Sequence, residues 1–250
     1  FFKACKRMNE KILKTLMHLF AIIAPAQGND TDSRLVVEAF LKRQLNQQGV
    51  DEYLSIFDIY YTEAQERLKK GNEARRNAAI SVRIIKICYD IGPQLTLKQK
   101  IIILVQLLEY CKTNSREVSP IELEFILTAA DGFNIDREDY QLIVRFILSP
   151  SDEIPDSGNI LVIDSIKDHS FINAHHLCSE LVKGQVRVLN IPSAEMLYVR
   201  AFDTGEIIMS GQLLREDKVY LFNRGASLKY QNSVPVYYSD VMRHFLNEKL

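Results

Sequence analysis

The segment SPSDEIPDSG, residues 149–158, divides this chain into two parts with different hydrophobic periods. It is polar, contains Pro150 and Pro155, and ends in glycine, a composition typical of a linker. Before it, apolar residues recur at the three- and four-residue spacing of amphipathic helices. After it, short β-branched and aromatic runs alternate with turn residues. The sequence therefore predicts an α+β chain with a helical domain over residues 8–148 and a small mainly-β domain over residues 159–250.

The helical half contains about seven predicted helices, judged from its apolar runs and its start and stop signals. Residues 101–108 are apolar almost all round, so we expect this helix to lie at the centre of the bundle. Thr96 and Asp136 are expected to cap helices, and residues 119–122 (SPIE) have the pattern of a capping box. Gly49 is expected to end a helical segment.

The first 26 residues imitate a secretory signal, because a basic stretch precedes an apolar run. Lys11, Lys14 and His18 interrupt that run, however, and its apolar residues follow helical spacing. This pattern favours an amphipathic helix that faces the core. No uncharged apolar run reaches the roughly 18 residues of a membrane span, so we expect no transmembrane segment.

The β half is predicted to form an antiparallel sandwich or roll from closely spaced short strands. Residues 203–205 (DTG) and 223–225 (NRG) are predicted tight turns, since glycine adopts positive φ without strain. Residues 239–247 are expected to form a short terminal helix.

Composition excludes several classes of protein. The 31 Lys and Arg residues nearly balance the 32 Asp and Glu residues, which argues against nucleic-acid binding through a broad positive field. With 25% charged residues, 10 Gly and 7 Pro, the chain is not of low complexity. Its four cysteines are scattered and form no CxxC pair, which is typical of reduced thiols in the cytosol.

No phosphate-binding loop, GxGxxG, HExxH or GxSxG motif is present, so we expect neither an enzyme with a self-contained site nor a bound cofactor. His169, His175, His176 and Cys178 are candidate ligands of a metal site, with surface or partly buried polar residues as the alternative interpretation. An unrecognised hydrolase built around His169, His175 or Cys178 is a further alternative. Adjacent histidines point in different directions on a strand or a helix, which makes joint chelation difficult.

Three other groups of residues are candidate binding sites. Basic residues before and within one predicted helix can contact phosphate or acidic lipid, or can form a solvated face; they are Lys69, Lys70, Arg75, Arg76 and Arg83. Aromatic residues of the β half can form a ligand platform or can pack in the sheet; they are Tyr220, Tyr230, Tyr237 and Tyr238. Loop acids are candidate ligands for a divalent cation, with helix capping as the alternative; they are Asp30 and Asp32, next to Asn29, and Glu117 and Glu122.

The helical half resembles the TerB-like domain of tellurite-resistance proteins. The resemblance covers about residues 8–148 and is carried by residues 117–122 (EVSPIE) and 132–140 (GFNIDREDY). It implies an all-helical fold with two hairpin loops whose acids are associated with divalent metal. Here those loops correspond to residues 26–34 and 114–122, where Gln27, Arg34 and Ser115 replace motif acids and Glu122 is retained.

The whole arrangement is also similar to the cytosolic N-terminal region of long bacterial ABC-transporter ATP-binding proteins. Residues 197–211 (LYVRAFDTGEIIMSG), 218–230 (KVYLFNRGASLKY) and 235–241 (PVYYSDV) carry this part of the resemblance. It implies a non-catalytic regulatory or interaction region at the cytosolic face of the inner membrane, with a protein partner or other domains of the same transporter as its partner. Any ATPase cassette would then follow residue 250. A divalent-metal-binding TerB-like stress-response domain is an alternative.

Overall fold

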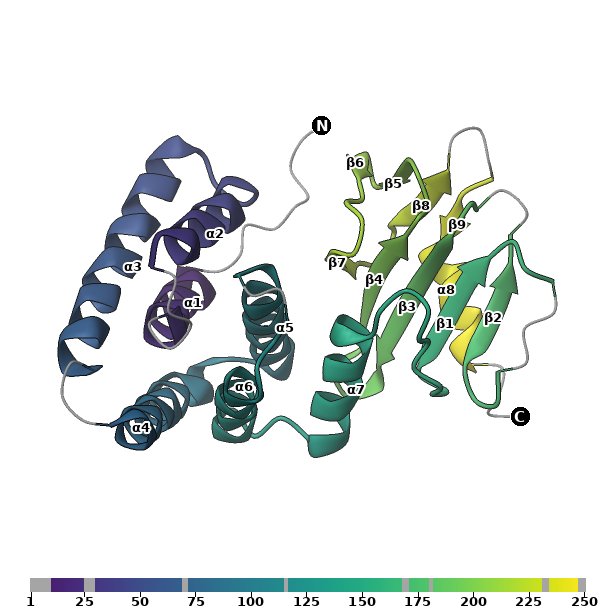
Figure 1. The fold of residues 1–250 in the computed structure, drawn as a ribbon. Helices are drawn as coiled ribbons and strands as arrows, with labels where there is room; N and C mark the ends of the chain where they lie inside the picture. The colour runs from purple at the N-terminus through teal and green to yellow at the C-terminus, as the bar shows by residue number, and fades with distance from the viewer. Residues whose placement is uncertain are drawn as a thin grey trace. The chain divides into compact units, whose positions relative to one another are not determined.

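The computed structural model describes residues 10–24, 30–68, 72–114, 117–167, 171–179, 182–230 and 234–246. The chain forms two compact units that meet in sequence between Tyr140 and Gln141. The first unit is helical, and the second consists mainly of β-strands with helical segments at both ends (Figure 1). The predicted α+β class, with a helical bundle followed by a small mainly-β region, is confirmed.

In its described residues, the first unit is built from six complete helices and the start of a seventh. They are α1 (Glu10–Ile23), α2 (Asp30–Lys42), α3 (Gln47–Leu68), α4 (Glu73–Ile91), α5 (Leu97–Asn114), α6 (Pro120–Gly132) and α7 (Arg137–Leu148), with a short 3-10 helix at Gly92–Gln94.

Helices α1 and α5 form the core of the helical unit. Ten of the fourteen residues of α1 are buried, so this helix is covered on nearly all sides, by α3, α4 and α5 among others. The expected central helix is α5, in which Ile101, Leu104 and Leu108 are completely buried. Phe20 of α1 stacks on Tyr110 of α5, with 4.4 Å between the ring centroids. The N-terminal apolar run is therefore a core helix in the structure.

The predicted helix starts agree with the hydrogen bonds. Ser119 and Glu122 form a complete capping box, and Thr96 and Asp136 accept backbone N–H bonds at the starts of α5 and α7. The prediction for Gly49 was wrong, because this glycine is the third residue of α3. Its N–H donates to Asn46 Oδ1, so the asparagine starts a helix where the glycine was expected to end one.

The second unit contains two sheets. Sheet A has the order β2-β1-β3-β4-β7 and sheet B has the order β6-β5-β8-β9. The strands are β1 (Ile160–Asp164), β2 (His175–Cys178), β3 (Gln185–Ile191), β4 (Met196–Phe202), β5 (Ile207–Met209), β6 (Gln212–Leu213), β7 (Val219–Phe222), β8 (Ser227–Tyr230) and β9 (Val236–Tyr237); a short 3-10 helix lies at Pro192–Ala194, and α8 (Tyr238–Leu246) follows β9.

One strand pair departs from the expected antiparallel arrangement. Strand β2 runs parallel to β1, with Leu161 opposite His175 and Asp164 opposite Cys178. Its short sequence, HHLC, contains no alternation of apolar and polar residues and was not predicted as a strand. The remaining strand pairs of the described residues are antiparallel.

The two long central strands of sheet A are buried on both faces. Val186, Val188 and Val199 lie in the apolar cluster that includes residues of sheet B and α8. On the opposite face, Arg187 of β3 and Arg200 of β4 stand directly across from each other and are almost completely buried. A charged residue at such a position needs hydrogen-bond partners, which the chain before β1 provides.

These two arginines bind the end of α7 and the predicted linker. Arg200 Nη1 donates to the carbonyls of Phe146 and Ser149, each at 2.7 Å. Arg187 donates to the carbonyls of Ser151 and Glu153, at 2.7 and 2.9 Å. The boundary between the compact units consequently falls inside α7, before the predicted linker at residues 149–158. Part of that linker is structurally attached to the β unit.

Across the described ranges, none of the helices combines the length and the apolar character that a bilayer crossing requires.

Candidate functional site

The helical unit contains an apolar pocket between three helices. Its volume is about 430 Å³, within the range of small-molecule sites. Helix α1 contributes Ile22, α3 contributes Ala64, and α4 contributes Ile80 and Val82. Ala78 and Ala79 of α4 complete the apolar lining. The small side chains of the three alanines leave space between helices that Leu or Phe would fill.

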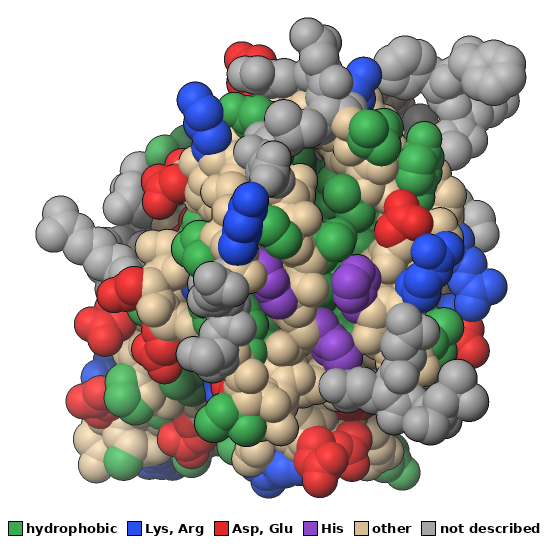
Figure 2. Space-filling view, turned by 90° about the vertical axis from the view of Figure 1, so that its right-hand side faces the viewer, with side chains coloured by type: hydrophobic (Ala, Val, Ile, Leu, Met, Phe, Trp, Pro, Cys, Tyr) green, Lys and Arg blue, Asp and Glu red, His purple; other side chains and the backbone are tan. Residues whose placement is uncertain are grey.

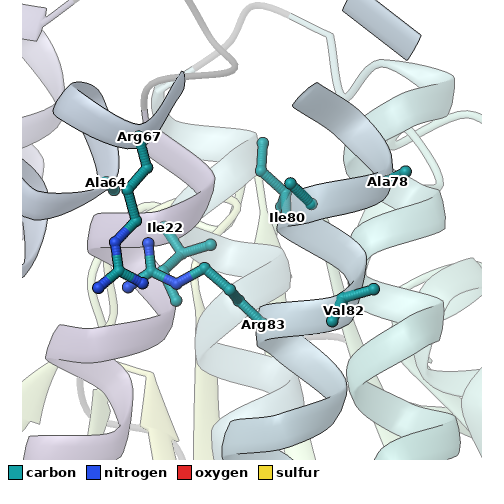
Figure 3. Close-up of a pocket in the computed structure, with 8 residues that line it drawn as sticks. Ile22, Ala64, Arg67, Ala78, Ile80, Val82 and Arg83 are labelled. Atoms are coloured by element: carbon teal, nitrogen blue, oxygen red, sulfur yellow. The ribbon is translucent and has the colours of Figure 1, made fainter. Parts of the chain in front are cut away.

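Two arginines also line this pocket. Arg67 reaches it from the last turn of α3 and Arg83 from the middle of α4, and Figure 3 shows their guanidinium groups near Ile22. Burial lowers the pKa of Arg83, and the positive charge of Arg67 lowers it further. The nearby Glu63 acts in the opposite direction. The pocket therefore combines an apolar lining with a pair of cations that repel each other.

His18 of α1 lies in the same electrostatic field. Its ring stacks on Tyr60, with 3.9 Å between centroids and planes 10° apart. Burial, followed by repulsion from Arg83, lowers the pKa of His18 from 6.5 to about 4. At neutral pH the imidazole is uncharged, so it adds no further positive charge beside the two arginines.

We expect His18 to make the protein less stable in mild acid. Because its folded-state pKa lies below its unfolded-state pKa, the unfolded chain binds more protons between pH 6.5 and 4. The free energy of unfolding should fall across this range, by on the order of 1–2 kcal/mol for a half-buried group. Urea denaturation of the wild type and His18→Phe at several pH values measures this difference. If both proteins lose equal stability between pH 6.5 and 4, His18 is not the cause.

Helix α4 has apolar side chains on two opposite faces. Ile80, Ile84 and Ile87 point into the core. On the outer face, Val82, Ile85 and Tyr89 are 65%, 49% and 77% exposed. With Ala78 they follow a spacing of four, three and four residues, which places them in one strip. Because Ala78 and Val82 also line the pocket, the exposed strip and the pocket form one continuous surface.

Of the four candidate loop acids, Glu117 and Glu122 have side chains that the structure describes. Among the described residues, no group of three or more His, Cys, Asp or Glu side chains is placed to hold a metal ion. Asp30 and Asp32 lie in the first turn of α2, but the structure does not describe their side chains. Asn29 lies outside the described residues. Glu117 is exposed in the loop before α6. Divalent-metal binding stays a prediction.

Glu122 serves a structural role in the described part of the chain. It is 3% exposed, and its Oε2 accepts from the backbone N–H and the hydroxyl of Ser119, both at 2.7 Å. Burial raises the pKa of the Cys111 thiol, and the adjacent Glu122 carboxylate raises it further. Glu122 therefore connects the start of α6 to the core helix α5. The proposed capping role of this retained acid is confirmed.

His175 and His176 are adjacent on β2, so their side chains point to different sides of the strand, and they make separate contacts. His176 Nε2 is 3.1 Å from Oδ1 of the buried Asp164, whereas His175 Nε2 is 3.0 Å from the carbonyl of Gly158. Burial lowers the pKa of His244 in α8, and the nearby His175 lowers it further. Figure 2 shows histidine side chains gathered on this face. His169 lies outside the described residues.

The described cysteines differ in exposure. Cys88 and Cys111 are buried, and burial raises the pKa of Cys88 to about 12, so its thiolate is disfavoured. Cys178 is exposed at the end of β2. The hydrolase alternative stays a prediction.

The candidate tyrosines are used mainly for packing. Tyr220, Tyr230 and Tyr238 are partly buried against the apolar cluster of the β unit, and Tyr237 is half exposed. The Tyr220 hydroxyl accepts the N–H of Arg215 at 2.9 Å. These contacts support the packing interpretation of the aromatic residues.

The candidate basic cluster is divided in the structure. Arg75 and Arg76 lie in the exposed first turn of α4, and Arg83 faces the pocket two turns later. Lys69 and Lys70 lie outside the described residues. Sequence reasoning missed Arg67, because Arg67 and Arg83 lie on different helices and only the packing of those helices places both at one pocket.

Comparison of this chain with protein-family models, with curated proteins and with solved structures finds no match.

Proposed function

We propose that this chain is a non-catalytic regulatory region that binds a ligand in its helical unit and works at the cytosolic face of a bacterial ABC-type transport system. The observation that carries the binding function is the apolar pocket between α1, α3 and α4. The transport context is supported by the resemblance of the helical half to TerB-like domains and of the β half to the N-terminal region of long ATP-binding proteins.

The outer face of α4 supports docking of a protein partner beside this pocket. Val82, Ile85 and Tyr89 form an exposed apolar strip, a feature that commonly marks interaction surfaces. A partner helix can contact such a strip through residues spaced three and four apart. Because Val82 belongs to both the strip and the pocket, a bound ligand would alter the surface that the partner meets. This coupling is the proposed regulatory mechanism.

A neutral fluorescent probe tests the binding function without invoking the arginines. We expect Nile red to become more fluorescent on addition of the protein, because the apolar pocket excludes water from the dye. Val82→Asp, which places a carboxylate in the lining, should weaken dye binding by about tenfold.

Ile59→Asp is the matched control for this experiment. Ile59 lies on α3, is 60% exposed and does not line the pocket, so the substitution introduces the same charge elsewhere on the helical unit. Its dye affinity should equal that of the wild type. No binding by the wild type, or equal weakening by both variants, would refute the pocket as the binding site.

A further inference from the structure

The pair of arginines indicates the chemistry of the ligand. We infer that the pocket binds a single-chain amphiphile with a carboxylate head, a fatty acid, whose head group lies between Arg67 and Arg83. This inference rests on the proposed function, because it names the ligand of the same pocket. It is carried by the combination of an apolar lining with two neighbouring guanidinium groups.

The charges favour an anion over a neutral ligand. The positive charge of Arg67 destabilises the charged state of Arg83, which is partly removed from water, as the lowered pKa of Arg83 indicates. An anion placed between them would replace this repulsion with two attractive interactions. Arginine also presents paired N–H donors that match the two oxygens of a carboxylate.

The charges beside the pocket favour a singly charged head group. Arg67 and Arg83 line the pocket, and Glu63 lies close enough to Arg83 to act on its pKa. The adjacent His18 is neutral at pH 7, since its pKa is lowered to about 4. A carboxylate brings one negative charge, whereas a phosphate monoester brings nearly two and is repelled more strongly by Glu63.

The apolar lining accounts for the hydrocarbon part of the ligand. Ile22, Ala64, Ile80 and Val82 provide only carbon atoms beyond their backbone, so they can cover an alkyl chain but cannot bind a polar one. Each methylene group transferred from water to such a lining contributes about 0.8 kcal/mol. The chain would therefore supply most of the affinity, and the arginines would select the head group.

Three ligands with the same alkyl chain test this assignment on the 250-residue chain. Isothermal titration with dodecanoate, dodecanol and dodecyl phosphate, each below its micellar concentration, compares carboxylate, neutral and phosphate heads. We expect dodecanoate to bind at least about tenfold more tightly than dodecanol, because charge-assisted hydrogen bonds are made only by the anion. Dodecyl phosphate is expected to bind more weakly than dodecanoate.

Substitutions of the arginines then locate the head group. Arg83→Gln and Arg67→Gln should each lower the affinity for dodecanoate about tenfold and leave the affinity for dodecanol unchanged. Arg76→Gln is the control, because Arg76 is an exposed arginine of the same helix that does not line the pocket. The thermal midpoint of each variant establishes that it is folded.

The outcomes separate this inference from the proposed function. Equal binding of dodecanol and dodecanoate, an equal effect of Arg76→Gln and Arg83→Gln, or preferential binding of dodecyl phosphate would overturn the carboxylate assignment while the pocket remains a binding site. Absence of binding by all three ligands and by Nile red would refute the proposed function itself.

Discussion

Replacing Arg200 with methionine is expected to destabilise the β unit by about 3 kcal/mol, because carbonyl groups in a buried place lose their hydrogen-bond donor. Arg200 is 2% exposed, and its Nε donates to Asp217 Oδ1 at 2.7 Å. Its Nη1 binds the carbonyls of Phe146 and Ser149 at the end of α7. Methionine fills a similar volume but donates no hydrogen bond, so the Phe146 carbonyl would lose a partner in a buried place. The segment before β1 would then lose part of its attachment to sheet A.

Arg187→Met is the matched comparison and should cost less, about 1 kcal/mol. Arg187 is as deeply buried as Arg200 and stands opposite it in the sheet. The guanidinium carbons of Arg187 and Arg200 lie 4.6 and 4.5 Å from the centroid of the Phe202 ring. Burial, followed by repulsion from Arg200, lowers the pKa of Arg187 to about 10. Its removal therefore relieves a buried like-charge pair. The carbonyls that Arg187 binds belong to Ser151 and Glu153, which are exposed residues. Water can therefore reach these carbonyls more readily than it can reach the carbonyl of the buried Phe146.

Urea denaturation combined with hydrogen exchange of the 250-residue chain measures both variants. For Arg200→Met, amide protection should fall in β1, β3 and β4, whereas protection of α1 and α5 should persist. If Arg187→Met lowers the free energy of unfolding as much as Arg200→Met does, the bonds of Arg200 to Asp217 and to the end of α7 add no stability beyond that of the Arg187 bonds.

Gly184→Ala is expected to destabilise the β unit by about 3 kcal/mol or more, from backbone strain together with steric overlap. Gly184 precedes β3 and has φ of +75°, a conformation that alanine adopts only with strain. A Cβ atom at this position would lie 2.2 Å from the carbonyl oxygen of Phe202 and 2.5 Å from the carbonyl of Asp203. These are backbone atoms at the end of β4, so relief of the overlap requires the β3–β4 pair to separate locally.

Gly211→Ala separates the steric effect from the conformational one. Gly211 has φ of +85°, and a Cβ atom added there would meet no atom within 4 Å. This variant should therefore lose only about 1 kcal/mol, the cost of the left-handed conformation for a residue other than glycine. Urea denaturation curves of both variants provide the comparison. Equal losses would mean that the close approach to Phe202 contributes nothing.

Local sequence patterns predicted most of the secondary structure, because they depend on neighbours along the chain. The capping box of Ser119 and Glu122 and the apolar period of α5 required only side chains three or four residues apart. Strand β2 was missed because its short sequence forms a strand only next to β1. Gly49 was misjudged because Asn46, three residues earlier, provides the helix start.

The sequence by itself determined the α+β class, the order of the two halves and the positions of most helices and strands, since hydrophobic period and capping act over a few residues. Only the tertiary structure decided that Arg67 and Arg83 line one pocket and that Arg187 and Arg200 attach the predicted linker to sheet A. These residues come from different helices or strands. Their proximity depends on how those elements pack across the core, which no local pattern records.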